Sequence, residues 1–221
     1  MNRRTFIKNT SKTTLGMGLA LSFPTYGMPK EKELFFKISL AQWSLHRSLR
    51  TGKLTTMDFP AKAKNDFGIH AVEYVNQFFL DKAKNRTFLK ALKQRTLDLN
   101  INNVLIMIDG EGDLGSTTKR PRSQAVENHY KWVEAAQSLG CHAIRVNAKG
   151  KGNKVEVAKA VTEGLHQLSS FAKAYAIDII VENHGGYSSN GDWLSGIMKN
   201  VNLANCGTSV SYTHLTLPTK A

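Results

Sequence analysis

The sequence predicts an α/β fold, and its pattern best matches a (β/α)8 TIM barrel truncated to about five βα units. Short apolar runs typical of buried strands alternate with longer stretches that have the periodicity of amphipathic helices. Each predicted strand begins roughly 32 to 39 residues after the previous one, which is the length of a βα unit. Strict alternation of this kind indicates parallel strands joined by right-handed crossovers.

The individual elements follow from this alternation. The predicted strands begin near Lys37, Ala71, Asn103, His142 and Asp178. The helical patterns between and after them cover residues 57–67, 82–99, 123–139, 155–175 and about 192–199. Glycine turn signals close two of these helices, at Gly68 and Gly140. Residues 205–208 read as the entry into a sixth strand.

An open, doubly wound sheet would show the same alternation as a barrel. However, no glycine-rich phosphate loop follows the first predicted strand, which disfavours the nucleotide-binding version of that fold. A complete barrel of this class usually needs about 250 residues. We therefore expect residues 35–208 to form a partial barrel.

The N-terminal segment resembles a twin-arginine export signal. Arg3 and Arg4 are followed, after Thr5, by the apolar Phe6 and Ile7 and then Lys8, and a weakly apolar run extends from Thr13 to Phe23. We expect residues 1–27 to be a signal peptide and the protein to be periplasmic or otherwise exported. A disordered basic N-terminus is the alternative.

The C-terminal segment, residues 209–221, has neither the strand nor the helix pattern of the preceding units. It resembles the translated read-through of a sequencing adapter, so we expect it to be a non-native tail. We also expect the chain as written to be an inactive fragment of a longer barrel.

The net charge and the cysteines limit the kinds of partner and metal site that the protein can have. The formal net charge is +13, but four of these charges lie in the predicted leader, and the remaining lysines are scattered along helices. Scattered lysines are typical of solvated helix faces, so we expect no nucleic-acid partner. No stretch is long and apolar enough for a stable membrane anchor. Cys141 and Cys206 have no metal-binding spacing and are expected to be free thiols.

Polar side chains gather at the carboxyl ends of all five predicted strands. In chain order these are Gln42, Ser44, His46, Glu73, Asn76, Gln77, Asp109, Glu111, Arg145, Asn147, Glu182 and His184. Parallel strands would bring them to one rim, where sites of such folds are built. Glu182 and His184 are two residues apart and would share a face. Acids, amides, imidazoles and one arginine suit a polyhydroxylated ligand and a divalent cation.

Four segments carry a family resemblance: KISLAQWSLHRSL, FGIHAVEYVNQFF, AVENHYKWVEAAQSLGCHAIRVNA and IVENHGGYSSNGDWL. Together they resemble the sugar phosphate isomerase/epimerase family, the xylose isomerase-like TIM barrels, over about residues 35–208. The segments around Glu73, Arg145 and Glu182 are the most specific. The resemblance implies a barrel with a divalent metal ion (Mn²⁺, Mg²⁺ or Zn²⁺) at its carboxyl mouth.

The resemblance also implies roles for individual residues. Glu182 would be both a metal ligand and the catalytic acid/base of a proton transfer next to a carbonyl group. The other usual metal ligands, an Asp, a His and a Glu, would lie beyond Thr208. The substrate, a small carbohydrate, would be contacted by a larger set: His184, Arg145, Asn147, Glu73, Asn76, Gln42 and His46.

Several alternatives remain open at this point. Glu73 and Arg145 could form an internal ion pair, and His46 could be a loop histidine without ligand contact. The same scaffold could serve a sugar-binding protein or a lyase or hydrolase that processes glycosides. A zinc phosphodiesterase of the endonuclease IV type is a further alternative, although histidine is sparse at these strand ends. Oligomerisation is possible.

Overall fold

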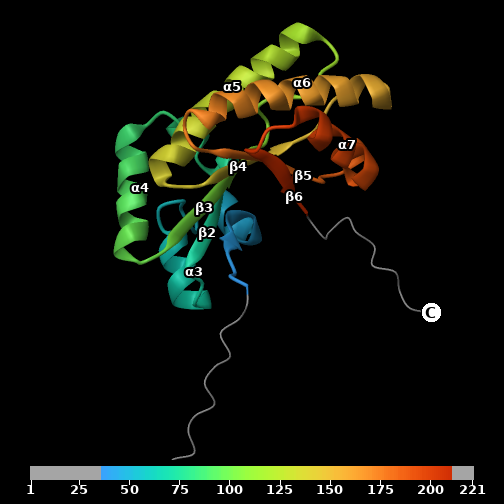
Figure 1. Cartoon of the computed structure of the whole chain (residues 1–221). Helices are drawn as coiled ribbons and strands as arrows, with labels where there is room; N and C mark the ends of the chain where they lie inside the picture. Colours follow the sequence, from blue (N-terminus) through green and yellow to red (C-terminus); the bar gives the residue numbers. More distant parts are fainter. Residues whose placement is uncertain (1–35, 211–221) are drawn as a thin grey trace, which may run out of the picture. The chain divides into compact units, whose positions relative to one another are not determined.

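The computed structural model describes residues 36–210, and the unit beginning at Ile38 contains the predicted barrel part. Within it, six parallel strands form one sheet in the order β1 to β6, so every strand lies beside its sequence neighbours (Figure 1). The strands are β1 (Leu40–Ala41), β2 (Ala71–Val75), β3 (Asn102–Met107), β4 (Ala143–Asn147), β5 (Asp178–Glu182) and β6 (Cys206–Ser209). This architecture confirms the predicted truncated parallel α/β barrel.

The five predicted helices are present, and each packs against the next along the chain. They are α3 (Phe59–Phe67), α4 (Arg86–Asp98), α5 (Lys119–Leu139), α6 (Lys154–Lys173) and α7 (Gly191–Val201). A short helix α2 (His46–Arg50) follows β1, and short 3₁₀ helices occupy Gln42–Leu45, Asn76–Phe78, Leu80–Lys82 and Gly186–Ser189. No helix in the described residues is long and apolar enough to cross a membrane.

Local sequence signals set the ends of these helices. Gly68 and Gly140 end α3 and α5 in the left-handed conformation, with φ angles of 65° and 79°, as the turn signals predict. Asn85, Asn153 and Asn190 cap the starts of α4, α6 and α7, because each side-chain oxygen accepts a hydrogen bond from a backbone N–H of the first turn.

The core lies between the sheet and the helices. In β5, Ile179 and Val181 are fully buried and belong to the same cluster as Leu165 and Leu168 of α6. Because side chains alternate along a strand, Ile180 and Glu182 face the opposite side of the sheet, the side that a barrel encloses. All six strands run the same way, so their carboxyl ends, with the polar residues that follow them, meet at one edge.

The predicted leader, residues 1–27, and most of the predicted tail lie outside the described residues. Ser209 is described and is the last residue of β6, where it pairs with Glu182 of β5.

Two loops at the carboxyl edge pack so closely that they leave no room for a side chain. A Cβ atom on Gly150 would lie 2.0 Å from the carbonyl oxygen of Gly115. Similarly, a Cβ atom on Gly164 of α6 would lie 2.3 Å from the carbonyl oxygen of Leu114. The loop between β3 and α5 therefore rests directly on the next loop and on α6, which holds the edge of the sheet in one shape.

We predict that Gly164→Ala destabilises the fold by about 1–3 kcal/mol, because the added methyl group overlaps backbone that cannot easily move. The matched control is Gly196→Ala in α7, where a Cβ atom meets nothing within 4 Å. That change should stabilise the protein by about 0.5–1 kcal/mol through helix propensity. Denaturant unfolding of both variants measures the difference, and equal effects of the two substitutions would contradict the close packing of α6.

We also predict different reactivities for the two free thiols. Burial raises the pKa of Cys141 to about 12, whereas Cys206 is only partly buried and its pKa is raised less sharply. Because the thiolate is the reactive form, iodoacetamide should label Cys206 before Cys141 in the native protein, and both should react readily in urea. Peptide mass spectrometry measures the two rates. Native labelling of Cys141 as fast as in urea would show that this part of the core is not formed.

Candidate functional site

Arg145 is the centre of the polar network at the carboxyl edge of the sheet. Its side chain is buried, with the residue 6% exposed, and it lies between acids from both neighbouring strands. The Nη1 atom donates a hydrogen bond to Oδ1 of Asp109 at 3.0 Å, and Nε lies 3.0 Å from Oε2 of Glu182. One buried guanidinium group therefore joins the ends of β3, β4 and β5.

The strand register explains why these groups meet. Asn147 of β4 lies opposite Glu182 of β5, and Arg145 lies two pairs earlier, opposite Ile180. Arg145 and Asn147 are two residues apart and share a face, so the long arginine side chain reaches up to the level of Glu182. Asn147 completes the network by donating from Nδ2 to Oδ1 of Asp109 at 2.7 Å.

The contact between Arg145 and Glu182 is ionic, without the geometry of a hydrogen bond. The Nε atom is buried and makes no hydrogen bond with the described residues, although it lies at ion-pair distance from the carboxylate. A buried charge is costly unless it is compensated, and two carboxylates compensate this one. The Nε–H group of Arg145 is therefore a buried donor that is compensated by charge and not by a hydrogen bond.

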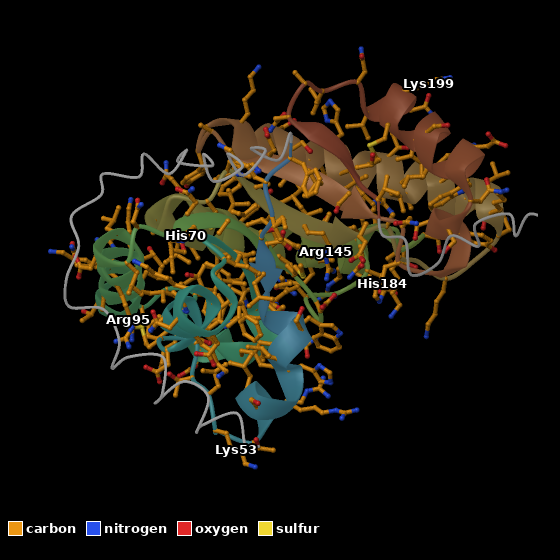
Figure 2. The ribbon with its side chains drawn as sticks, turned by 90° about the horizontal axis from the view of Figure 1, so that it is seen from below. Lys53, His70, Arg95, Arg145, His184 and Lys199 are labelled. Atoms are coloured by element: carbon orange, nitrogen blue, oxygen red, sulfur yellow. The ribbon has the colours of Figure 1, made fainter. Side chains whose placement is uncertain are left out.

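His184 lies two residues beyond the end of β5, and its Nδ1 is 3.5 Å from the second carboxylate oxygen of Glu182. The His184 side chain is 58% exposed, while that of Glu182 is 17% exposed. Figure 2 shows Arg145 and His184 in the same region. His70, which lies just before the amino end of β2, is well away from them. Glu182 thus stands between a buried cation and an accessible imidazole.

Three of the residues predicted to contact substrate are instead tied into the protein. Asn76 is fully buried and exchanges two hydrogen bonds with the backbone of Asp109, at 2.9 and 3.0 Å. Gln42 is also fully buried; its Oε1 accepts from the N–H of Val75 at 2.8 Å, and its Nε2 contacts Thr56. Glu73 accepts a hydrogen bond from Ser39. These contacts position the strand ends, and substrate contact by the three residues stays a prediction.

Two further expectations can be compared with the structure. Arg145 pairs with Asp109 and Glu182, so the alternative of an ion pair between Glu73 and Arg145 is not the arrangement found in the described residues. His46 stacks on Trp43, with the ring centroids 5.0 Å apart, and its Nδ1 bonds the Trp43 carbonyl oxygen at 2.7 Å. His46 therefore lies on the segment after β1, away from the Arg145 network.

A cavity of about 980 Å³ lies beside this network, between the loops that follow β3, β4 and β5. Asn147 and His184 are the predicted substrate-contacting residues that line it, together with Asp109 and Glu111 from the same set of strand ends. His129 of α5 and Tyr187 also line it. Reading strand ends could not identify His129, because it lies in the middle of a helix.

The described residues do not fit a metal ion by themselves. They contain no group of three or more His, Cys, Asp or Glu side chains placed to hold one. Glu182, the one predicted ligand, has its two carboxylate oxygens directed at Arg145 and His184. Its role as a metal ligand stays a prediction.

Known proteins place this architecture in context. The chain resembles in fold the crystal structure of D-psicose 3-epimerase determined in the presence of D-fructose, with a TM-score of 0.66 and 14% identity. It also resembles the IolI protein with a bound zinc atom, with a TM-score of 0.65 and 15% identity. In both comparisons, 81% of this chain is covered, and the chain spans 64% of the other protein's length.

A third similar structure is the apo form of 3-keto-D-glucoside 4-epimerase, YcjR, from E. coli, with a TM-score of 0.60 and 12% identity over 72% of this chain and 64% of that chain. No curated protein matches the sequence. At these identities the similar structures show the fold. The sequence itself matches a family model described as "Xylose isomerase-like TIM barrel" over residues 61–217. The chain therefore belongs to the xylose isomerase-like TIM barrel family.

Proposed function

We propose that this protein is a sugar isomerase or epimerase that transfers a proton at the carbon next to a carbonyl group, with Glu182 as the acid/base. The observation that carries the proposal is the position of Glu182 at the end of β5, where Arg145 holds it next to His184, a residue that lines the cavity. The similar structures include D-psicose 3-epimerase and 3-keto-D-glucoside 4-epimerase, which supports this class of reaction.

The proposed chemistry assigns a task to each residue of the network. The Glu182 carboxylate takes the proton from the carbon next to the carbonyl group, and the electron pair moves onto the carbonyl oxygen to give an enediolate. Return of the proton by Glu182 to the neighbouring carbon gives the isomer. Epimerisation also needs a proton donor on the opposite face of the sugar, and the family resemblance gives that task to the glutamate expected beyond Thr208. Arg145 fixes the carboxylate in position, because its own place is fixed by Asp109.

His184 and Asn147 are the proposed contacts to the hydroxyl groups of the sugar. Both line the cavity, and the exposed His184 side chain lies next to the carboxylate of Glu182, the proposed base. Binding a sugar there would replace water around Glu182, which strengthens electrostatic contacts with the reacting atoms.

A divalent metal ion is part of the proposal, as the family resemblance implies, and bound at the mouth it would stabilise the negative oxygen of the enediolate. Glu182 is the described residue that would contribute to holding it. Because the other described residues do not complete a site, the steps above are assigned to the side chains alone.

We further propose that the protein is exported, because residues 1–27 resemble a twin-arginine signal, and that it has no nucleic-acid partner.

We predict that Glu182→Gln lowers proton exchange between a bound ketose and solvent by about 100-fold or more, the scale of general acid–base catalysis. Incorporation of deuterium from D₂O into neutral ketohexoses, followed by NMR, measures this half-reaction. It needs only a base and a bound sugar, so it is less demanding than complete turnover. The matched control is Glu127→Gln, at an exposed position of α5.

The outcomes separate catalysis from binding. Loss of exchange in Glu182→Gln, with normal exchange in Glu127→Gln, supports the proposed role. Exchange that survives in Glu182→Gln would remove Glu182 as the base. Sugar binding without exchange in the unmodified protein would favour the alternative of a sugar-binding protein on the same barrel.

A further inference from the structure

His129 lines the cavity from the helix side and has no role in the chemistry described above. It lies in the middle of α5 and is 3% exposed. The cavity's other polar side chains come from strand ends and from the segments that follow them, so His129 is the one among the described residues contributed by the interior of a long helix. A histidine this buried needs partners for both ring nitrogens, and its partners determine what it can bind.

One ring nitrogen of His129 is committed to its own helix. Nδ1 lies 2.7 Å from the carbonyl oxygen of Ala125, and a carbonyl oxygen can only accept a hydrogen bond. The proton must therefore be on Nδ1. Burial lowers the pKa of His129, which favours the neutral ring, so Nε2 carries a lone pair and acts as an acceptor.

Nε2 makes no hydrogen bond with any described residue, and it is not sealed in the protein interior. The fully buried side-chain atoms that lack a partner in the described part of the chain are Nε of Arg145 and Oγ of Ser169. Because Nδ1 points to the helix backbone while the ring lines the cavity, Nε2 is the polar atom that His129 offers to a molecule in the cavity.

The loop beside His129 is fastened to α5. Glu111, from the loop after β3, is fastened to α5 next to His129: its backbone oxygen accepts from Asn128 at 3.1 Å, and its carboxylate accepts from Lys131 and Trp132 at 3.0 and 2.6 Å. Gly112 of the same loop lies against Ala125, where a Cβ atom would come within 2.9 Å of the alanine side chain. The wall of the cavity beside the ring is therefore fixed, and the ring itself is held by the bond from Nδ1 to Ala125.

The charges that line the cavity are largely balanced. Asp109 and Glu182 share the charge of Arg145, and Glu111 pairs with Lys131. The remaining charged side chains of the lining, Asp113 and Lys149, have opposite signs. A cavity without excess positive charge has no particular attraction for a phosphate group, so its charge suits an uncharged ligand.

We propose that Nε2 of His129 accepts a hydrogen bond from a hydroxyl group of an uncharged sugar bound in this cavity, which makes His129 a specificity-determining residue. This inference rests on the proposed function, because it assumes a sugar in the cavity, and it adds the helix contact and the preference for an unphosphorylated sugar. A site that bonds a hydroxyl group through a buried acceptor discriminates against analogues that lack that hydroxyl, since the acceptor is then left unpaired.

The first test uses the unmodified full chain. Long-range ¹H–¹⁵N NMR of the imidazole groups should show His129 with its proton on Nδ1, and the Nε2 resonance should shift when a neutral ketohexose such as D-fructose is added to saturation. A proton found on Nε2 overturns the inference, as does an Nε2 resonance that stays unchanged while the sugar binds.

The second test measures affinity. His129→Phe keeps a ring and removes the acceptor, and it should weaken binding of the neutral ketohexose about tenfold, the effect of one hydrogen bond of ordinary net strength. The control is His166→Phe, on the exposed part of α6, which should bind as the unmodified protein does. Thermal melts check that both variants are folded, and the NMR test stands if His129→Phe is not.

The phosphorylated ketohexose should bind no more tightly than the neutral one. Unchanged affinity in a folded His129→Phe variant, tighter binding of the sugar phosphate, or no saturable binding of any neutral ketohexose would each overturn the inference. The proposed function fails in a different way: a sugar that binds and shifts Nε2 but undergoes no proton exchange would leave the His129 contact in place and remove the catalytic role of Glu182.

Discussion

The buried charge of Arg145 is the constraint on which the edge of the sheet depends. A guanidinium group that is removed from water must find opposite charges close by, and only the strands on either side of β4 can supply them. Asp109 and Glu182 therefore have to stand at the same level, which requires the register that pairs Asn147 with Glu182. Asn76 then holds the backbone of Asp109 from β2, so the ends of four neighbouring strands are linked through one cation.

Most of the fold could be predicted from the sequence, because each βα unit carries its own hydrophobic period and turn residues. The strands after the first begin within one residue of their predicted positions, and Asn205 does lead into a sixth strand. The first strand was predicted to begin near Lys37, but only Leu40 and Ala41 pair with β2. The strand ends there because the chain turns into a 3₁₀ helix at Gln42. The irregularity in the pairing of β2 with β3, beside Val72 and Glu73, also left no sequence signal, since it depends on how two separate strands fit together.

The candidate site was predictable in composition but not in its pairings. The polar residues do follow strand ends that meet at one edge of the sheet, and the side chains of Glu182 and His184 do lie next to each other. The sequence could not decide whether Arg145 meets Glu73 or Glu182. Glu73 lies on β2, two strands away at about 4.8 Å per strand, and Asp109, just after the intervening strand β3, meets the guanidinium first. Equally, no local pattern distinguishes an amide that binds a ligand from one, such as Gln42, that holds two segments together.

The attachment of Glu111 to α5 has a consequence for how such a barrel can diversify. In this fold, new specificities are usually attributed to changes in loops, which vary without disturbing the scaffold. Here Glu111, which lines the cavity, is held by Asn128, Lys131 and Trp132 of α5, and His129 of the same helical turn lines the cavity directly. Substitutions along this helical turn would reshape the cavity while every strand end stayed the same. Changes of ligand preference among related chains should therefore be accompanied by substitutions in α5 as often as by substitutions in the loops.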